Sequence, residues 1–204
     1  MIYKYLYRPA IQKNPNVNGQ TQLSQIFFDD FWGNPLAHPG SHKSYRPLCT
    51  LSYRLNYLIG GLEPFGYHLV NVLLHSMATA LVTYTASRLF HKFIPSLITG
   101  LLFACHPIHT EAVAGIVGRA DIMACIFFLL SLNFYMSYCI MRCVNHGHGR
   151  TKFLLLSVLF ATMSMLTKEQ GITVLAVNVT FDIIYNYHLR KRFRLQDTFK
   201  MVSY

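Results

Sequence analysis

The sequence predicts an all-α multi-spanning membrane protein, and two observations carry this prediction. Of the 204 residues, 52% are hydrophobic and only 13% are charged, whereas soluble domains average about 25% charged residues. The charges also lie in clusters between long uncharged stretches, as is typical of chains that cross a bilayer several times. The formal net charge is +10, but nucleic-acid binding would need one continuous basic patch. We therefore expect membrane lipid and no nucleic acid among the partners.

About five transmembrane helices are expected, because each span needs roughly 20 mostly apolar residues. The stretches that reach or approach this length are residues 65–90, 93–105, 122–141, 153–166 and 172–187. The last two are joined by residues 167–171 alone, which is too short a segment to hold a domain. These two stretches therefore predict a helical hairpin whose tip lies at one membrane face.

The distribution of Lys and Arg assigns the two faces of the membrane. With five spans, the segments after the first, third and fifth spans fall on one side and hold ten of the 18 basic residues. That side is expected to be cytosolic and to include a basic tail over residues 188–204. The opposite, lumenal side receives residues 1–64, the loop over 106–121 and the 167–171 tip, with six of the eight acidic residues.

Residues 1–64 are polar and rich in turn-forming Pro, Gly and Asn. They predict an irregular lumenal loop with a few short helices on the membrane surface. A basic segment of this length does not cross a membrane easily, and no signal peptide precedes it. We therefore expect that an upstream helix is missing from this chain.

The loop over 106–121 is the most informative segment. Pro107 suits the first turn of a helix, and the apolar residues after it recur at helical spacing, which predicts an amphipathic lumenal helix over 107–121. Glu111, Gly115 and Gly118 share its other face, so a ligand would find room beside a carboxylate. The alternative is that the glycines allow close helix packing.

Two further details of this loop bear on its chemistry. In the packing alternative, Glu111 pairs with Arg119 or with water. His106, His109 and Glu111 lack the spacing of an H-E-x-x-H zinc motif, so no metal site is expected here.

Charged residues also mark the hairpin tip and the lumenal loop. Charges beside lipid are functional candidates, and the compact charge of Lys168 suits the phosphate of a lipid whose tail stays in the membrane. The alternatives are a mutual ion pair with Glu169 or snorkelling to headgroups. Arg46 is a second candidate for an anionic headgroup, or an interfacial anchor. His68, Asn71 and His75 form a polar stripe in the first span, which predicts bonds across helices.

Four blocks carry a resemblance to a known family. They are IFFDDFWGNPL (26–36), SHKSYRPLCTLSYRLNYLIGGLEPFGYHLVNVLLHS (41–76), HPIHTEAVAGIVGRAD (106–121) and MLTKEQGITVLAVN (165–178). In content, order and spacing they resemble the transmembrane and tetratricopeptide repeat-containing proteins, from about residue 10 onward. The resemblance covers only the front of that family's membrane part and includes none of its repeats.

This resemblance implies a fragment of a GT-C-type helical bundle in the endoplasmic reticulum membrane. The implied activity is transfer of mannose from dolichyl-phosphate mannose to Ser or Thr of lumenal, cadherin-like acceptor proteins. A carboxylate would act as general base, and cations would stabilise the phosphate leaving group. No cofactor is assigned, and a divalent cation is left open.

The site residues expected on this basis lie on the lumenal side. Glu111 is the candidate acid, and Glu111 and Lys168 are predicted to approach one cavity. The candidates for binding the donor phosphate are Lys168, Arg119 and Arg46, with Glu169, His109 and Asp121 in support.

The family's lumenal pair of aspartates would fall near Leu6 and Tyr7, and neither of these residues is acidic. The catalytic residues are therefore unknown, and the activity of this chain alone is in doubt. Two alternatives remain: a non-catalytic membrane module that binds or stabilises partners, and a small transporter or channel.

Overall fold

The computed structural model describes residues 8–143 and 149–187, and its regular elements in these ranges are all helices. The positions near Leu6 and Tyr7 and the basic tail over 188–204 lie outside the described residues. The longer helices are α2 (Pro47–Gly60), α3 (Pro64–Phe90), α4 (Phe93–Cys105), α5 (His109–Ala114), α6 (Arg119–Cys143) and α7 (Gly149–Thr167). Residues 174–187 form a further helix. Short helical turns occur at η1 (Arg8–Gln12), η2 (Leu23–Phe27), η3 (Ile116–Gly118) and η4 (Glu169–Thr173).

The predicted fold class is confirmed. Three helical stretches in the described residues have the length and composition to cross a membrane, namely α3, residues 116–142 and residues 150–167. The helix α4 has 13 residues, so it extends about 20 Å and is shorter than a hydrocarbon core of about 30 Å. The expected fifth span begins in the 3-10 turn η4 and becomes helical at 174.

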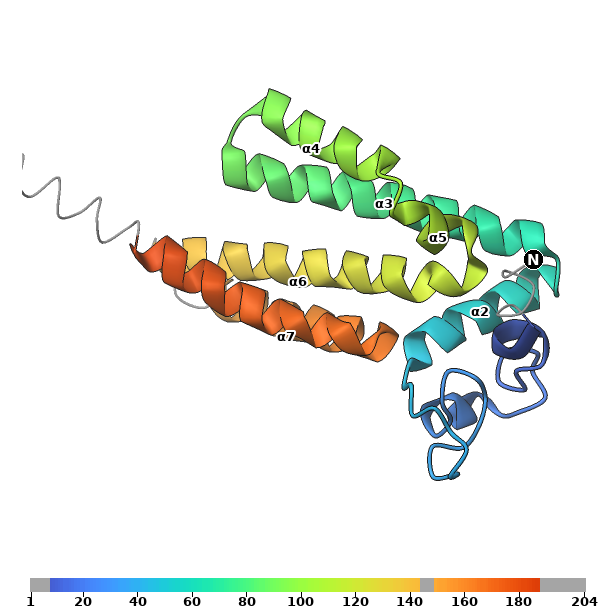
Figure 1. Ribbon diagram of the computed structural model, residues 1–204. Coiled ribbons are helices and arrows are strands. Elements are labelled where there is room, and N and C mark those ends of the chain that lie inside the picture. Colours follow the sequence, from blue (N-terminus) through green and yellow to red (C-terminus); the bar gives the residue numbers. More distant parts are fainter. Residues whose placement is uncertain (1–7, 144–148, 188–204) are drawn as a thin grey trace, which may run out of the picture.

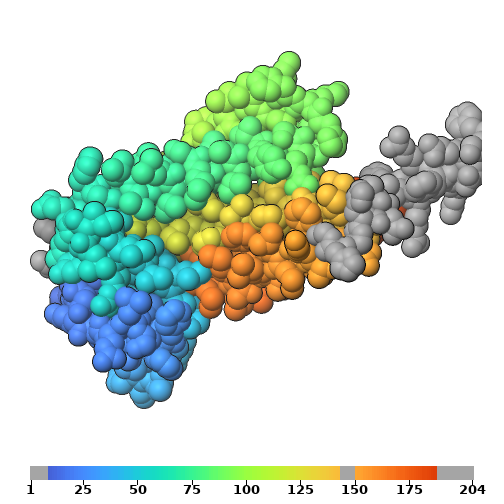
Figure 2. Space-filling view, turned by 180° about the vertical axis from the view of Figure 1, so that it is seen from behind, coloured from blue at the N-terminus to red at the C-terminus, as the bar shows by residue number. Residues whose placement is uncertain are grey.

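The helices run side by side in one bundle (Figure 1). The helix α4 folds back along α3, α3 packs on α6, and α6 packs extensively on α7. Residues 8–46 and α2 gather at one end of this bundle, where α3 and α6 begin and α7 ends. Figure 2 shows the same arrangement from behind, with α3 and α4 along one side of the bundle and α7 along the other.

An apolar core joins the N-terminal segment to the bundle. Its buried members include Phe31, Tyr53 of α2, Tyr67 of α3, and Ile116. The hydroxyl of Tyr53 donates a hydrogen bond to the backbone oxygen of Ile116 at 2.9 Å. This core therefore fixes α2 against the start of α6, at the end of the bundle where the acidic residues were expected.

The N-terminal segment is organised by a buried carboxylate. Asp30 is 2% exposed and accepts hydrogen bonds from the Ser41 hydroxyl and from the backbone N–H groups of Trp32, Asn34 and His42. Burial would raise the pKa of Asp30, but these hydrogen bonds together hold it below its ordinary value. The expected irregular loop is thus an ordered, hydrogen-bonded segment.

The amphipathic helix expected over 107–121 is wrong as one continuous element. The helix α5 ends at Ala114, Gly115 has an extended backbone (φ −80°, ψ 118°), and α6 begins at Arg119. The break brings Gly118 against α5, where an added Cβ would lie 2.5 Å from the Cα of Ala112. Close packing of this kind requires glycine, and it turns the chain into α6.

Candidate functional site

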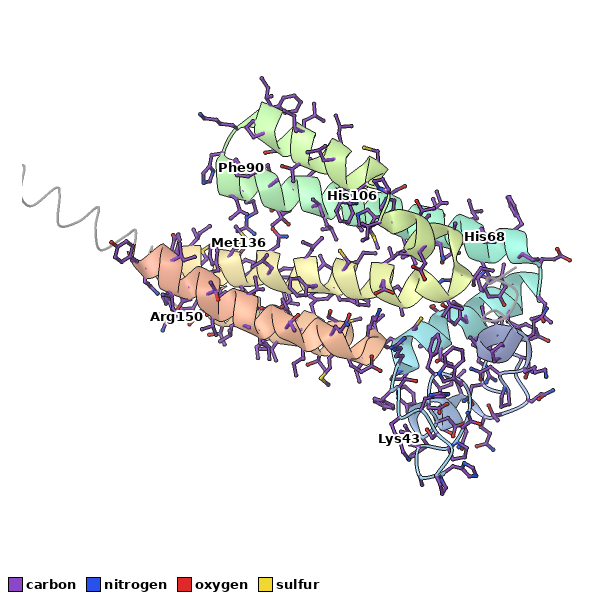
Figure 3. The ribbon with its side chains drawn as sticks, in the orientation of Figure 1. Lys43, His68, Phe90, His106, Met136 and Arg150 are labelled. Atoms are coloured by element: carbon purple, nitrogen blue, oxygen red, sulfur yellow. The ribbon has the colours of Figure 1, made fainter. Side chains whose placement is uncertain are left out.

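A cavity of about 550 Å³ lies at the end of the bundle where α2 meets α3 and α6. Its walls come from segments that are far apart in the chain: the residue before α2, the first turns of α3, the α5–η3 segment, the start of α6 and the residue after α7. Figure 3 shows His68, one of its lining residues, on the first part of α3. The polar side chains in the lining are Arg46, His68, Glu111, Asp121 and Lys168.

Glu111 and Lys168, which were predicted to approach one cavity, both line this one. Glu111 is exposed, and within the described residues its carboxylate has no hydrogen-bond or ion-pair partner. It does not pair with Arg119, as the packing alternative had proposed. A carboxylate without a partner is able to accept a proton from a bound hydroxyl group.

Lys168 forms its ion pair across the cavity rather than along the chain. Its ammonium contacts the Asp121 carboxylate at the start of α6, so the alternative of a Lys168–Glu169 pair is wrong. Lys168 has an extended backbone (φ −154°, ψ 136°), and the turn after it is tight. An added Cβ on Gly171 would lie 2.4 Å from the backbone carbon of Ser164. The tip of the hairpin is therefore pressed onto the end of α7, which points Lys168 into the cavity.

Arg46 and Glu169 form a second ion pair between distant segments. The Nη2 of Arg46 lies 3.0 Å from Oε2 of Glu169, and its Nε lies 3.2 Å from the same oxygen. The guanidinium also lies over the ring of Phe31 at 5.2 Å. Partial burial would raise the pKa of Glu169, but the Arg46 bonds keep it below its usual value. This pair fastens η4 to the segment before α2.

Both cations keep donors free for a ligand. An arginine carries five N–H donors and a lysine ammonium carries three. Glu169 is bonded through Nε and Nη2 of Arg46, so both N–H groups of Nη1 remain without a partner in the described structure. Lys168 uses one donor on Asp121. An anionic group in the cavity is thus able to bind both cations without breaking either ion pair.

Arg119, expected to help bind the donor phosphate, lies outside the cavity lining. Its side chain is 0% exposed and it is bonded through all of its nitrogens: to Asn71 Oδ1 at 2.8 Å, to the Tyr67 backbone oxygen at 3.0 Å and to Ser52. The guanidinium also lies 4.7 Å from the ring centroid of Tyr53. Arg119 is therefore a buried tie between α2, α3 and α6 and has no face left for a phosphate.

The polar stripe on α3 divides into separate roles. The predicted bonds across helices are confirmed for Asn71, which is fully buried and donates to the Gly115 backbone oxygen at 3.2 Å. His75 lies 3.3 Å from the Ala104 oxygen and its ring is 5.2 Å from that of His109. Burial, and then the nearby His75 and His106, lower the pKa of His109. His109 is outside the cavity lining, whereas His68 is part of it.

The Arg46–Glu169 and Lys168–Asp121 ion pairs could not be predicted from the sequence. Arg46 and Glu169 are 123 residues apart and Asp121 and Lys168 are 47 apart, so no local spacing announces either pair. His68 carried a signal, because it lies one helical turn before Asn71 on the same face. Asp121 was expected only in a supporting role, and its position opposite Lys168 is a product of the tertiary fold.

The range that builds this cavity matches a known family. A sequence model of the family described as Dolichyl-phosphate-mannose-protein mannosyltransferase matches residues 38–200, which contain every lining residue. The chain belongs to this family. The expected resemblance to membrane O-mannosyltransferases is thereby confirmed.

Individual relatives agree with the mannosyltransferase family. The chain is 52% identical over 191 residues to Protein O-mannosyl-transferase tmtc2 of Xenopus laevis, which is 94% of this chain and 23% of the relative. It is 50% identical over 191 residues to Protein O-mannosyl-transferase TMTC2 of Mus musculus, with 94% and 23% covered. It is 47% identical over 184 residues to Protein O-mannosyl-transferase TMTC1 of Mus musculus, with 88% and 20% covered. The chain thus spans about a fifth to a quarter of these curated relatives, and no solved structure matches it.

Proposed function

We propose that this chain forms the donor-binding part of a mannosyltransferase that uses dolichyl-phosphate mannose and acts on Ser or Thr of lumenal proteins. The observation that carries the proposal is the cavity lined by two cations with free donors and by an unpartnered carboxylate. Phosphate oxygens suit the N–H groups of Arg46 and Lys168, and the carboxylate of Glu111 suits the acceptor hydroxyl. The isoprenoid tail would remain in the membrane beside the helices.

The chemistry asked of the cavity is an attack by an acceptor hydroxyl on the anomeric carbon of mannose. The hydroxyl proton passes to a carboxylate, the new glycosidic bond forms, and the bond from the anomeric carbon to the phosphate oxygen breaks. Dolichyl phosphate then leaves with the electron pair of that bond, and its growing negative charge is stabilised by the two cations. Glu111 is the proposed proton acceptor among the described residues.

Donor binding is tested on the purified chain. Retention of radiolabelled dolichyl-phosphate mannose is measured in detergent micelles, with dolichyl phosphate and dolichol as competitors. Dolichyl phosphate is expected to compete and dolichol, which lacks the phosphate, is not. Lys168→Ala is expected to weaken retention, whereas Lys152→Ala, an exposed lysine outside the cavity, is the matched control. Equal competition by dolichol would show that the phosphate is not what the cavity binds.

Transfer is tested by exchanging this chain into the matching segment of a full-length relative. Glu111→Gln is expected to lower the transfer rate about a hundredfold or more, which is the range for loss of a general base. Glu63→Gln, an exposed acid outside the cavity lining, is the control and is expected to be neutral. Retained donor binding without any transfer by the unsubstituted exchange would instead favour the non-catalytic membrane module.

We further propose that the cavity end faces the lumen of the endoplasmic reticulum. Support comes from the short segments at the other end of the bundle, which carry Arg88, Lys92, Arg142, Arg150 and Lys152, because Lys and Arg in short loops beside the spans favour the cytosolic side. Pro39→Asn creates an Asn-Gly-Ser glycosylation sequon in the exposed N-terminal segment. When the variant is placed in the full-length exchange described above, microsomes are expected to glycosylate it, and a full-length product without glycan would place the cavity end in the cytosol.

A further inference from the structure

A second cavity lies between α3 and α4, at the far end of the bundle. Its volume is about 540 Å³ and its lining runs from Ala80 to Leu97. Along α3, His68 in the first cavity and Ser87 in the second are 19 residues apart, which corresponds to roughly 30 Å. The two cavities are therefore separate sites at opposite ends of the bundle, and the second has no part in the proposed transfer of mannose.

One end of this second cavity is polar and basic. His91, Lys92, Ser87 and Ser96 line it, and none of its lining residues is acidic. The Lys92 side chain is exposed, and within the described residues its ammonium has neither a hydrogen bond nor an ion pair. The hydroxyl groups of Ser87 and Ser96 donate to the backbone oxygens of Tyr84 and Lys92, so it is the unpaired ammonium of Lys92 that suits this end to an anionic group from outside.

The other part of the cavity is apolar. Ala80, Phe93 and Leu97 line it, and Phe93 and Leu97 are exposed to the extent of 78% and 41%. The two helices meet at Thr83 and Gly100, where an added Cβ on Gly100 would lie 2.1 Å from Thr83 Oγ1. From this contact the groove opens toward the turn at His91 and Lys92. The site thus has an apolar slot beside a basic rim. This arrangement matches a lipid, which has an apolar acyl chain attached to a charged headgroup.

The surrounding charge selects the kind of lipid. The end of α3 and the start of α7 lie at the same end of the bundle, as the labels Phe90 and Arg150 in Figure 3 show, and α6 also ends there in Figure 1. Arg88 is bonded to Asn133 and Ser137 and Arg142 is bonded to Asp182, so these two arginines are engaged within the protein. Basic ends of membrane bundles face the cytosolic leaflet, whose lipids include anionic species that basic residues attract.

We propose that the α3–α4 groove binds an anionic glycerophospholipid. Its phosphate lies at Lys92, beside the turn between α3 and α4, and its acyl chain lies along Phe93 and Leu97. This lipid would fill the space between α3 and the short helix α4, which packs on α3 and on no other helix to a comparable extent.

Native mass spectrometry of the purified chain tests this site. Phosphatidylserine and phosphatidylcholine with the same acyl chains are added in turn, and the bound fraction is measured against lipid concentration. Lys92→Gln is expected to weaken phosphatidylserine binding about fivefold, the factor equivalent to about 1 kcal/mol per basic residue near an anionic membrane surface. Lys152→Gln removes another exposed lysine at the same end of the bundle and is expected to change nothing. Equal losses in both variants would overturn the site in favour of diffuse surface attraction.

A second variant tests the apolar slot independently of charge. Ala80→Trp places a large ring in the groove from an exposed position of α3 and is expected to abolish selective binding of phosphatidylserine over phosphatidylcholine. Soluble glycerophosphoserine, which carries the same headgroup without acyl chains, is expected not to bind. Undiminished selectivity in Ala80→Trp, or binding of glycerophosphoserine as tight as that of the lipid, would overturn the proposal.

Discussion

The two ends of the helical bundle handle their charged residues differently. At the cavity end, Arg46 and Lys168 are each held by an acid from a distant segment, so charges there are balanced while N–H donors remain free. At the opposite end, Arg88 bonds to an amide and a hydroxyl group, and Lys92 has no partner among the described residues. The cavity end is therefore held together by ion pairs and is nearly neutral, whereas the opposite end keeps its positive charge.

The buried core beneath the cavity supports the first of these ends. Arg119 joins α2, α3 and α6 through Ser52, Tyr67 and Asn71. Without this tie, the segments that carry Arg46 and Asp121 would lose their common support. At the opposite end, the ties among the described residues include Arg142 with Asp182 and Arg88 with Asn133, each of which joins two helices.

The largest expected effect comes from Arg119→Lys. An ammonium cannot donate to three acceptors in the plane of a guanidinium or stack on Tyr53 in the same way, and it leaves buried carbonyl groups without donors. We expect a loss of roughly 2–4 kcal/mol in the free energy of unfolding, measured by denaturant titration of the Trp32 fluorescence in detergent. Arg150→Lys, which changes an exposed arginine at the opposite end, is the control. Equal stability of both variants would show that Arg119 does not hold α2, α3 and α6 together.

Glycines at the two ends of the bundle differ in what surrounds them. Gly118→Ala sets a Cβ against the backbone of Ala112, which cannot give way, and is expected to cost about 2–3 kcal/mol. Gly100→Ala at the opposite end meets a Thr83 side chain, which is able to rotate, and the gain of about 1 kcal/mol in helix propensity offsets part of the strain. Gly60→Ala meets nothing within 4 Å and serves as the control. The fall in thermal unfolding temperature is expected to be largest for Gly118→Ala, smaller for Gly100→Ala and smallest for Gly60→Ala. The reverse order would contradict this expectation.

The ion pairs predict a smaller, pH-dependent effect at the cavity end. The pKa of Glu169 is lower in the folded protein than in the unfolded chain, so its stabilisation is present above the unfolded value near 4.5 and is lost as pH falls through the lowered folded value. The contribution stays below about 1 kcal/mol, because the two side chains are 21% and 47% exposed and water screens them.

The measurement is the difference in unfolding temperature between the natural chain and Glu169→Gln across the acidic range. The difference is expected to shrink toward zero as the pH falls below the ordinary pKa of a glutamate. A difference that stays constant over this range would mean that the Arg46 pair does not contribute through the charge of Glu169.

The smallest expected effect lies at the opposite end. His91 ends α3 with a left-handed backbone (φ 52°, ψ 26°), which carries a cost for any residue that has a Cβ. His91→Gly removes this cost, and the greater freedom of glycine in the unfolded chain offsets part of the gain, so stability should rise by about 0.5 kcal/mol. Lys92→Gly, at an extended position, is the control that should not gain. A fall in unfolding temperature for His91→Gly would indicate that the imidazole itself holds the turn.

Much of this architecture was predictable because it rests on local properties of the chain. The uncharged stretches predicted α3, α4, α6 and α7 with ends within a few residues, since each helix satisfies its own backbone hydrogen bonds in a membrane. The spacing of basic residues predicted that the ends of α3 and α6 and the start of α7 lie together, and Figure 1 agrees. Glu111 and Lys168 were expected at one cavity on the same grounds of sidedness.

Other features depended on packing that no local pattern reveals. The 107–121 helix failed because Gly118 allows a close approach to Ala112 that breaks the helix at Gly115. Arg119 looked like a ligand for phosphate from its type and place, yet the docking of α2 onto α3 and α6 buried it completely.

The sequence by itself determined the membrane class, the order of the helices and the side on which the acids gather, because composition and charge act residue by residue along the chain. The tertiary structure alone decided which cations remain accessible. Arg46, Lys168 and Arg119 all carry a positive charge, but their partners come from segments that meet only after folding. Burial and hydrogen bonding, which depend on those meetings, made two of them cavity residues and the third a structural tie.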